Sequence, residues 1–409
     1  MILDELINMP KKDPFESIHI PPIMDEAEIE AVVRVLKSKK LTLLSGKRIK
    51  KFEQEFAKYI GTKEAIAVNS GTAALHVGLS ALDVGPGDEI IIPPYTFVAT
   101  ATAVLHQNAI PIFVDINPKT YCINPEEIEK AITPKTKGII PVHIFGHPAD
   151  MDPILEIAAK HDLFVIEDAC QAHGAEYKGK RVGSIGDLGC FSFFESKNMM
   201  TGEGGIITTN DSELAAASRL VRHHGEPSWY VYDRLGYNYR MTEVQAALGL
   251  VQLKRLDQLN QTRIEYAKFY FDNLENVDVL QLPFVSKDVK HVFHAFAPLI
   301  MPEKLNVSKE YFLKKLNEGV PITKRIYPQP LYEAKLFKDR MGYGPLKCPF
   351  TCPYYNKDIS YDLNLPVVED ICTRVIGLPT SPFIQKPMLD NAIEKIQRVV
   401  KELKQSTII

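Results

Sequence analysis

The stretch CFSFFESKNMMTGEGG, from Cys190 to Gly205, joins a run of apolar residues to a polar, glycine-rich turn. The apolar residues continue to Phe194, which is typical of a buried strand, and Lys197 follows in the turn. Most lysines are solvated surface charges. An amine between a buried strand and a glycine-rich loop can instead attack a carbonyl, because burial lowers its pKa. Lys197 is therefore a candidate nucleophile, and Ser192 offers a hydroxyl to a phosphate.

The strand expected at Cys190–Phe193 belongs to a series of apolar runs that alternate with helix-like segments. The other expected strands are Ala65–Val68, Glu89–Ile92, Ile110–Val114, Gly138–Val142, Leu163–Ile166 and Gly205–Thr208. The expected helices between them include Thr72–Leu82, Pro125–Ile132, Asp152–His161 and Ser212–Val221. Apolar strands alternating with helices predict an α/β fold with a mostly parallel sheet covered on both faces. Ligands of such sheets bind at the carboxyl ends of the strands.

The pattern changes from Met241 onward, where apolar residues recur at helical spacing for many turns. This predicts a long helix that leads into a second domain. The last third mixes a strand-like segment, His291–Ile300, with the expected helices Lys309–Gly319 and Lys386–Leu403. With 409 residues the chain is long enough for two domains. We expect a large domain over residues 1–250 and a smaller α+β domain over residues 251–409.

Charge and composition exclude several classes of protein. The chain has 48 basic and 51 acidic residues without a block of like charge, which argues against a nucleic-acid partner. The N-terminal stretch MILDELINMPKKDPF lacks the pattern of a secretory signal. The uncharged run Ile90–Val114 is interrupted by Pro93 and Pro94, so we expect no membrane helix. Cys348 and Cys352 do not form a Cys-x-x-Cys pair, so we expect no metal site and free thiols in a reducing cytoplasm.

Three more segments follow expected strands. NSGTAAL, residues 69–75, opens a helix whose free N–H groups could hold a phosphate, although Asn69 or Ser70 could simply cap that helix. VIEDACQAHGA, residues 165–175, ends a strand with two carboxylates. Asp168 could pair with a protonated ring nitrogen or cap the next segment. In PPYTFVAT, residues 93–100, Phe97 could stack on a flat ring or pack as a core aromatic.

These segments, with LGYNYRMTEVQAALGLVQL at residues 235–253, occur in the order and spacing of the DegT/DnrJ/EryC1/StrS family. The resemblance runs from Ile20 to the C-terminus and is strongest from Ala65 to Leu253. It implies a pyridoxal 5′-phosphate (PLP)-dependent aminotransferase of fold type I, the aspartate aminotransferase kind. Members of the family act chiefly on nucleotide-linked keto sugars.

The resemblance also implies roles for matching residues. Lys197 looks like the lysine that forms the internal aldimine with PLP, and Asp168 resembles the aspartate that pairs with the pyridine nitrogen. Gln171 is similar to the glutamine beside the phenolic oxygen of the ring, and Phe97 to the aromatic residue that stacks on it. The phosphate is expected at Gly71, Thr72 and Ser192. Asn238 resembles an asparagine that reaches the phosphate of a neighbouring subunit, which implies a homodimer with active sites at its interface, although it could also be a turn residue.

By this resemblance the amino donor is Glu or Gln, and the two half-reactions give ping-pong kinetics. Two alternatives stay open: a PLP-dependent sugar dehydratase, or a non-catalytic protein that binds PLP or a sugar nucleotide as a regulator. Lys197 argues against the dehydratase branch, which has a histidine at that position.

Substrate contacts are expected from residues 321–353, where Tyr327 and Tyr332 could bind the substrate or pack internally. The PLY sequence at residues 330–332, with the insertion after it, resembles the branch acting on keto cyclitols or making aminohydroxybenzoate. The acceptor is therefore expected to be a keto sugar or a keto cyclitol. Cys170, two residues after Asp168, replaces a smaller family residue and is expected to pack.

Overall fold

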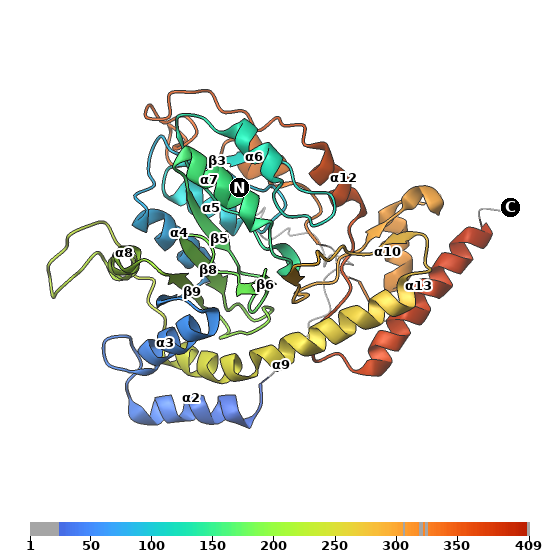
Figure 1. Cartoon of the computed structure of the whole chain (residues 1–409), viewed down its shortest axis with the longest axis horizontal. Helices are drawn as coiled ribbons and strands as arrows, with labels where there is room; N and C mark the ends of the chain where they lie inside the picture. The colour runs from blue at the N-terminus through green and yellow to red at the C-terminus, as the bar shows by residue number, and fades with distance from the viewer. Residues whose placement is uncertain (1–23, 306, 319–321, 324–325, 407–409) are drawn as a thin grey trace, which may run out of the picture.

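The computed structural model describes residues 24–305, 307–318, 322–323 and 326–406. Its centre is a seven-stranded sheet with the strand order β1-β9-β8-β5-β4-β2-β3 (Figure 1). The strands of this sheet are β1 Glu64–Val68, β2 Glu89–Ile92, β3 Ile110–Phe113, β4 Thr136–Ile139, β5 Phe164–Asp168, β8 Leu188–Ser192 and β9 Gly205–Thr209. All seven correspond to the strands expected from the apolar runs.

The sheet is mixed but mostly parallel. Strands β3, β2, β4, β5 and β8 pair in parallel, whereas β9 runs antiparallel to both of its neighbours, β8 and β1. The carboxyl ends of β5 and β8 therefore lie at the same edge, with Asp168 paired with Cys190 in the register. This edge is where the sequence predicted the chemistry.

Both faces of the sheet are covered, and strand pleating assigns residues to them. Ile66 and Val68 of β1 pack in one apolar cluster with helix α4, Gly71–Ala81. Ala65 and Ala67 of the same strand pack in another, with helix α3, Arg48–Ile60. Five more helices surround the sheet and its connections: α2 Glu26–Ser38, α5 Ala99–His106, α6 Pro125–Ala131, α7 Met151–His161 and α8 Ser212–Arg222.

The expected long helix is α9, Glu243–Leu274, drawn in yellow in Figure 1, where it rises toward the right with α2 below its first half. It begins with a capping box in which Thr242 and Gln245 exchange hydrogen bonds, a strong signal for a helix start. Its N-terminal half packs against α2 and α3, and its C-terminal half leads to a second apolar cluster. The remaining helices are α10 Lys309–Asn317, α11 Lys335–Lys338, α12 Pro366–Arg374 and α13 Lys386–Ser406.

A division into domains at residue 250 is too simple for the observed packing. The second cluster draws on residues from Ala267 to Leu403, including α10 and α13. However, Phe337, Phe350 and Tyr361 pack in the first cluster with the large sheet. The segment that contains them therefore packs against the large core, where these three rings are buried.

The strand expected at His291–Ile300 is also wrong for most of its length. Only its last two residues form a strand, β12, Leu299–Ile300, which pairs with β10, Leu280–Gln281. The short strand β11, Val289–Lys290, lies just before the segment. The segment is apolar because it is buried between the two clusters. The hairpin of β6, Glu176–Tyr177, and β7, Lys180–Arg181, was not expected. No described helix is long and apolar enough to cross a membrane. The N-terminal stretch considered as a secretory signal lies outside the described residues.

Candidate active site

Lys197 and Asp168 lie at the carboxyl edge of the sheet, as predicted. Asp168 is the last residue of β5 and is buried, and Lys197 is half-buried in the turn after β8. Burial lowers the pKa of Lys197, while the nearby Cys170 and Asp168 oppose that shift. The two side chains are therefore close enough to interact, and the amine loses its proton more readily than a surface lysine.

Hydrogen bonds orient the carboxylate of Asp168. Thr100 Oγ1 donates to Asp168 Oδ2 at 2.8 Å, and the backbone N–H of Cys170 donates to Oδ1 at 3.2 Å. Thr100 is itself buried, and its hydroxyl lies 2.9 Å from that of Thr96. Both carboxylate oxygens thus have a donor, which holds the group in one orientation. Thr100 lies in the segment at residues 93–100, but its role was not predicted because helical periodicity does not reveal which strand end a residue faces.

The neighbouring carboxylate, Glu167, points to the opposite face of the sheet. It accepts hydrogen bonds from the backbone N–H groups of Gly183, Ile185 and Gly186 at 2.7 to 2.8 Å. His143 Nε2 lies 3.0 Å from Glu167 Oε2. The N–H of Ala149 donates to His143 Nδ1, so Nε2 carries the hydrogen and donates to the carboxylate. Glu167 is fully engaged in structure, which leaves Asp168 as the carboxylate of the site.

Gly71 and Ser192 form a tight contact next to these residues. A methyl group added at Gly71 would lie 2.6 Å from Ser192 Cβ and 3.1 Å from Cys170 Sγ. Ser70 caps α4 by accepting a hydrogen bond from the N–H of Ala73 at 3.0 Å. The first N–H groups of a helix have no partner within it, and Thr72 follows Gly71 in that first turn. The capping alternative is therefore correct for Ser70, yet the cap still leaves helix N–H groups for an anion.

Gln171 connects three parts of the chain. Its Oε1 accepts from the N–H of Phe145 at 3.0 Å, and its Nε2 donates to the hydroxyl of Tyr327 at 3.0 Å. The Tyr327 ring stacks on Phe145, with ring centroids 5.9 Å apart, and contacts the buried Tyr95 edge-on. Burial raises the pKa of Tyr327, so its phenol stays protonated. Tyr327 thus lies beside the site residues.

Tyr332 does not. It is 2% exposed, packs on Phe113, and its hydroxyl donates to Glu369 at 2.6 Å. Its phenol anchors α12, which favours the packing alternative over a substrate contact for Tyr332.

Two candidate residues are exposed. Phe97 is 59% exposed just before α5, the helix that carries Thr100. Asn238 is exposed and forms a backbone bridge with His223. The carbonyl of the next residue, Tyr239, accepts from the N–H of Asn69 at 2.9 Å, so this segment lies beside the start of α4. The ring of Phe97 is accessible to a ligand at this edge of the sheet.

The arrangement fits pyridoxal phosphate by its chemistry. It combines an amine whose pKa is lowered, a fixed carboxylate, and a helix start that only a glycine can occupy against Ser192. These are the groups needed to bind an aldehyde covalently, to hold a ring nitrogen in its protonated form, and to bind a phosphate. The α/β fold with this site defines a PLP-dependent aminotransferase of fold type I.

Sequence and structure comparisons agree with this class. The DegT/DnrJ/EryC1/StrS aminotransferase family matches residues 22–363, and the chain belongs to this family. It is 44% identical over 294 residues to GDP-perosamine synthase of Caulobacter vibrioides, covering 70% of this chain and 79% of the relative. It is 37% identical to a UDP-N-acetyl-3-dehydro-alpha-D-glucosamine 3-aminotransferase of Acidithiobacillus ferrooxidans, covering 93% and 96% of the two chains. Both are named as enzymes of nucleotide-linked amino sugars.

A solved structure carries the cofactor in its amino form. NtdA of Bacillus subtilis with bound PMP is 32% identical, with a TM-score of 0.80 over 98% of this chain and 91% of that chain. The protein described here is accordingly a PLP-dependent enzyme that transfers amino groups.

Proposed function

We propose that the protein transfers an amino group from Glu or Gln to the keto group of a nucleotide-linked sugar. The observation that carries this proposal is the meeting of Lys197, Asp168 and Gly71 at one edge of the sheet, in a family whose named relatives act on nucleotide sugars. These relatives favour a sugar acceptor over a cyclitol.

Pyridoxal phosphate, when bound, supplies an aldehyde and a ring that withdraws electrons from an attached carbon. Lys197 supplies the amine for the covalent link. Because burial lowers its pKa, the free amine of Lys197 would act as a base that takes the proton from the α-carbon of the donor and delivers it to the C4′ carbon of the cofactor.

Asp168 has the role of holding a proton at the ring nitrogen. Thr100 and the N–H of Cys170 fix its two oxygens, so the carboxylate is oriented before any ligand arrives. The N–H groups of Gly71 and Thr72 with the hydroxyl of Ser192 would hold the phosphate, and Phe97 would stack on the ring.

Gln171 and Tyr327 extend the site toward the substrate. The Tyr327 hydroxyl accepts from Gln171, so its own hydrogen remains for another acceptor on the cofactor or the substrate. Asn238 is exposed, which suits a contact with the phosphate of a second subunit, and we therefore include a homodimer in the proposal.

The test begins with Lys197→Ala and with Lys287→Ala as a control at an exposed lysine. Borohydride reduction followed by peptide mass spectrometry should find the cofactor on the peptide of Lys197 in the native protein and the control. The Lys197→Ala variant should carry no such adduct and transfer no amino group. An unchanged adduct in Lys197→Ala would refute the assignment.

Substrate and donor are tested separately. Keto sugars linked to UDP, GDP and dTDP are offered with Glu or Gln, and the products are analysed by mass spectrometry. Aminated sugar, with parallel lines in double-reciprocal plots, supports the proposal. A dehydrated sugar formed without a donor would instead identify a dehydratase.

A further inference from the structure

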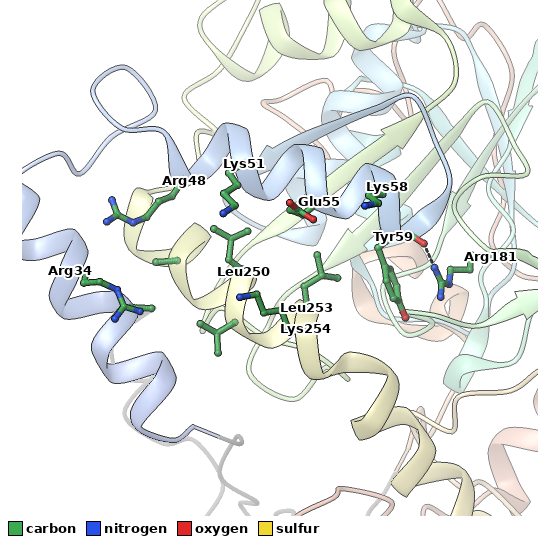
Figure 2. Close-up of a pocket in the computed structure, with 13 residues that line it drawn as sticks. Arg34, Arg48, Lys51, Glu55, Lys58, Tyr59, Arg181, Leu250, Leu253 and Lys254 are labelled. Carbon is green, nitrogen blue, oxygen red and sulfur yellow. Dashed lines mark hydrogen bonds between the residues drawn. The ribbon is translucent and has the colours of Figure 1, made fainter.

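A cavity lies away from the site at the carboxyl edge. It is a groove of about 630 Å³ between helices α2, α3 and α9. Figure 2 shows side chains from these three helices around a common space: Arg34 from α2, Lys51 from α3 and Lys254 from α9. No residue of the PLP site lines it. The full lining is Ala31, Arg34, Arg48, Lys51, Glu55, Lys58, Tyr59, Arg181, Ala247, Leu250, Val251, Leu253 and Lys254.

The groove is strongly basic in a chain that is slightly acidic overall. Six of its lining residues are Lys or Arg and only Glu55 is acidic, whereas the formal net charge of the whole chain is −3. Each arginine has a carboxylate partner outside the lining: Arg34 pairs with Glu30 at 2.9 Å, Arg48 with Glu243 at 3.6 Å, and Arg181 with Asp257 at 3.8 Å. With these partners counted, six positive charges face four negative ones.

The excess charge comes from three lysines. Within the part of the chain that the structure describes, Lys51, Lys58 and Lys254 form no salt bridge, and all three are exposed. Like charges gathered in one concavity repel each other and raise the local positive potential. Such a cluster attracts an anion of higher charge than one carboxylate.

Two of the basic residues lie at the start of α3. Arg48 and Lys51 lie in the first turn of the helix, where the helix dipole favours anions and disfavours cations. The start of α3 is instead capped by the buried Glu243, whose carboxylate accepts from the N–H groups of Lys47, Arg48 and Ile49 at 2.9 to 3.2 Å. Arg48 pairs with this capping carboxylate at 3.6 Å, whereas the charge of Lys51 in the first turn opposes the helix dipole and has no salt-bridge partner among the described residues.

The floor of the groove is apolar. Leu250 and Leu253 of α9 are partly exposed there, beside Ala247 and Val251. A ligand that matches both features has a charged end and an apolar body. The groove is concave and its volume falls within the range of about 300 to 1,000 Å³ typical of small-molecule sites. That shape favours a small molecule over a flat membrane surface.

We propose that this groove binds an organic phosphate of nucleotide size. The phosphate groups lie among Lys51, Lys254 and Arg34, where ammonium and guanidinium groups provide several charged donors. The organic part lies on Leu250 and Leu253. This site is independent of the proposed amino transfer and needs neither Lys197 nor a bound cofactor.

The test uses UDP as the probe on the full-length protein with its cofactor. Lysines are acetylated with an N-hydroxysuccinimide ester, and the modification rate of each is measured by peptide mass spectrometry. UDP should slow the acetylation of Lys51 and Lys254 several-fold and leave the exposed Lys287 and Lys338 unchanged. This readout reports the groove itself, so UDP bound at the catalytic site does not affect it.

Two smaller probes separate charge from shape. Pyrophosphate and uridine should each protect Lys51 and Lys254 less than UDP does. Pyrophosphate provides the charge without the organic part, and uridine provides the organic part without the charge. Equal protection by pyrophosphate would reduce the groove to an adventitious anion site and overturn the proposal. Absence of protection by UDP would overturn it as well.

Calorimetry with a charge-reversal variant gives the second test. Lys51→Glu with Lys254→Glu should weaken UDP binding at the groove about a hundredfold, at about tenfold for each lost charged contact. The matched control, Lys287→Glu with Lys338→Glu, changes the net charge of the protein equally and should bind UDP as the native protein does. Equal weakening in both variants would mean that only overall charge matters, which contradicts a built site.

Discussion

Replacement of Gly71 by alanine tests the geometry of the proposed phosphate site. A methyl group there would lie 2.6 Å from Ser192 Cβ, well inside van der Waals contact. Neither atom is at the end of a flexible side chain, so α4 or β8 must move. Overpacking of this kind typically costs about 1 to 3 kcal/mol. Gly85→Ala is the matched control, because a methyl group at Gly85 meets nothing within 4 Å.

The control also removes an opposing effect. A change from glycine to alanine restricts the unfolded chain and can stabilise a protein by about 0.4 to 1 kcal/mol. Both variants share this term, so their difference isolates the steric cost at Gly71. If the start of α4 moves away, the helix N–H groups also leave the phosphate. A loss of about 1 to 3 kcal/mol in binding would weaken PLP affinity roughly 5- to 150-fold.

Two assays distinguish a loss of folding stability from a loss of PLP affinity. Urea unfolding of cofactor-free protein measures the cost to the scaffold, and titration of PLP followed by absorbance measures the cost to binding. We expect Gly71→Ala to have a lower free energy of unfolding than Gly85→Ala, or a weaker PLP affinity, by about 1 to 3 kcal/mol in at least one assay. If both variants unfold at the same urea concentration and bind PLP equally, the contact with Ser192 does not constrain the site and the reasoning is wrong.

Three further changes have specific outcomes. Thr100→Val removes the donor to Asp168 Oδ2 and should lower kcat by a factor equivalent to about 1 to 3 kcal/mol, with the circular dichroism spectrum unchanged. Glu243→Gln leaves one oxygen to accept the N–H groups at the start of α3, so urea unfolding should show a loss of about 1 to 3 kcal/mol. Burial lowers the pKa of His173 to about 3, so the unfolded chain gains a proton there as the pH falls below 6.5 while the folded chain does not. The native protein should therefore lose stability between pH 6.5 and 3, at about 1.4 kcal/mol per pH unit, and His173→Leu should remove that part of the loss in urea titrations across this range.

The sheet was predictable because its strands are buried on both faces. Continuous apolar runs such as Ile90–Ile92 in β2 mark such strands without any tertiary information, and all seven strands are present. The capping box at Thr242 likewise marks the start of α9 locally. The strand expected at His291–Ile300 was wrong for a different reason. That segment is apolar because it lies between two clusters, and burial alone does not distinguish a strand from an irregular buried chain.

Contacts of the site were harder to predict than its residues. Lys197 and Asp168 are marked by their positions after strands, whereas the hydrogen bond from Thr100 to Asp168 joins residues 68 positions apart. The same limit applies to Tyr327 and Tyr332, which lie five residues apart in one segment. Tyr327 accepts a hydrogen bond from the site residue Gln171, whereas Tyr332 anchors α12 by donating to Glu369. The path of the chain between the two tyrosines decides which of them faces the site.

The adjacent carboxylates Glu167 and Asp168 explain why the site is rigid. Side chains alternate between the faces of a strand, so two neighbouring acids at the end of β5 must point to opposite faces. Glu167 is completely buried, and three backbone N–H groups with His143 satisfy it. These bonds tie the end of β5 to the loop at residues 183–186, and the carbonyl of Asp168 accepts from the N–H of His143. The backbone of Asp168 is therefore held from the far face of the sheet, and its side chain is held from the near face by Thr100. A carboxylate that must face a ring nitrogen gains from this arrangement, because its orientation is fixed by structure before the cofactor binds.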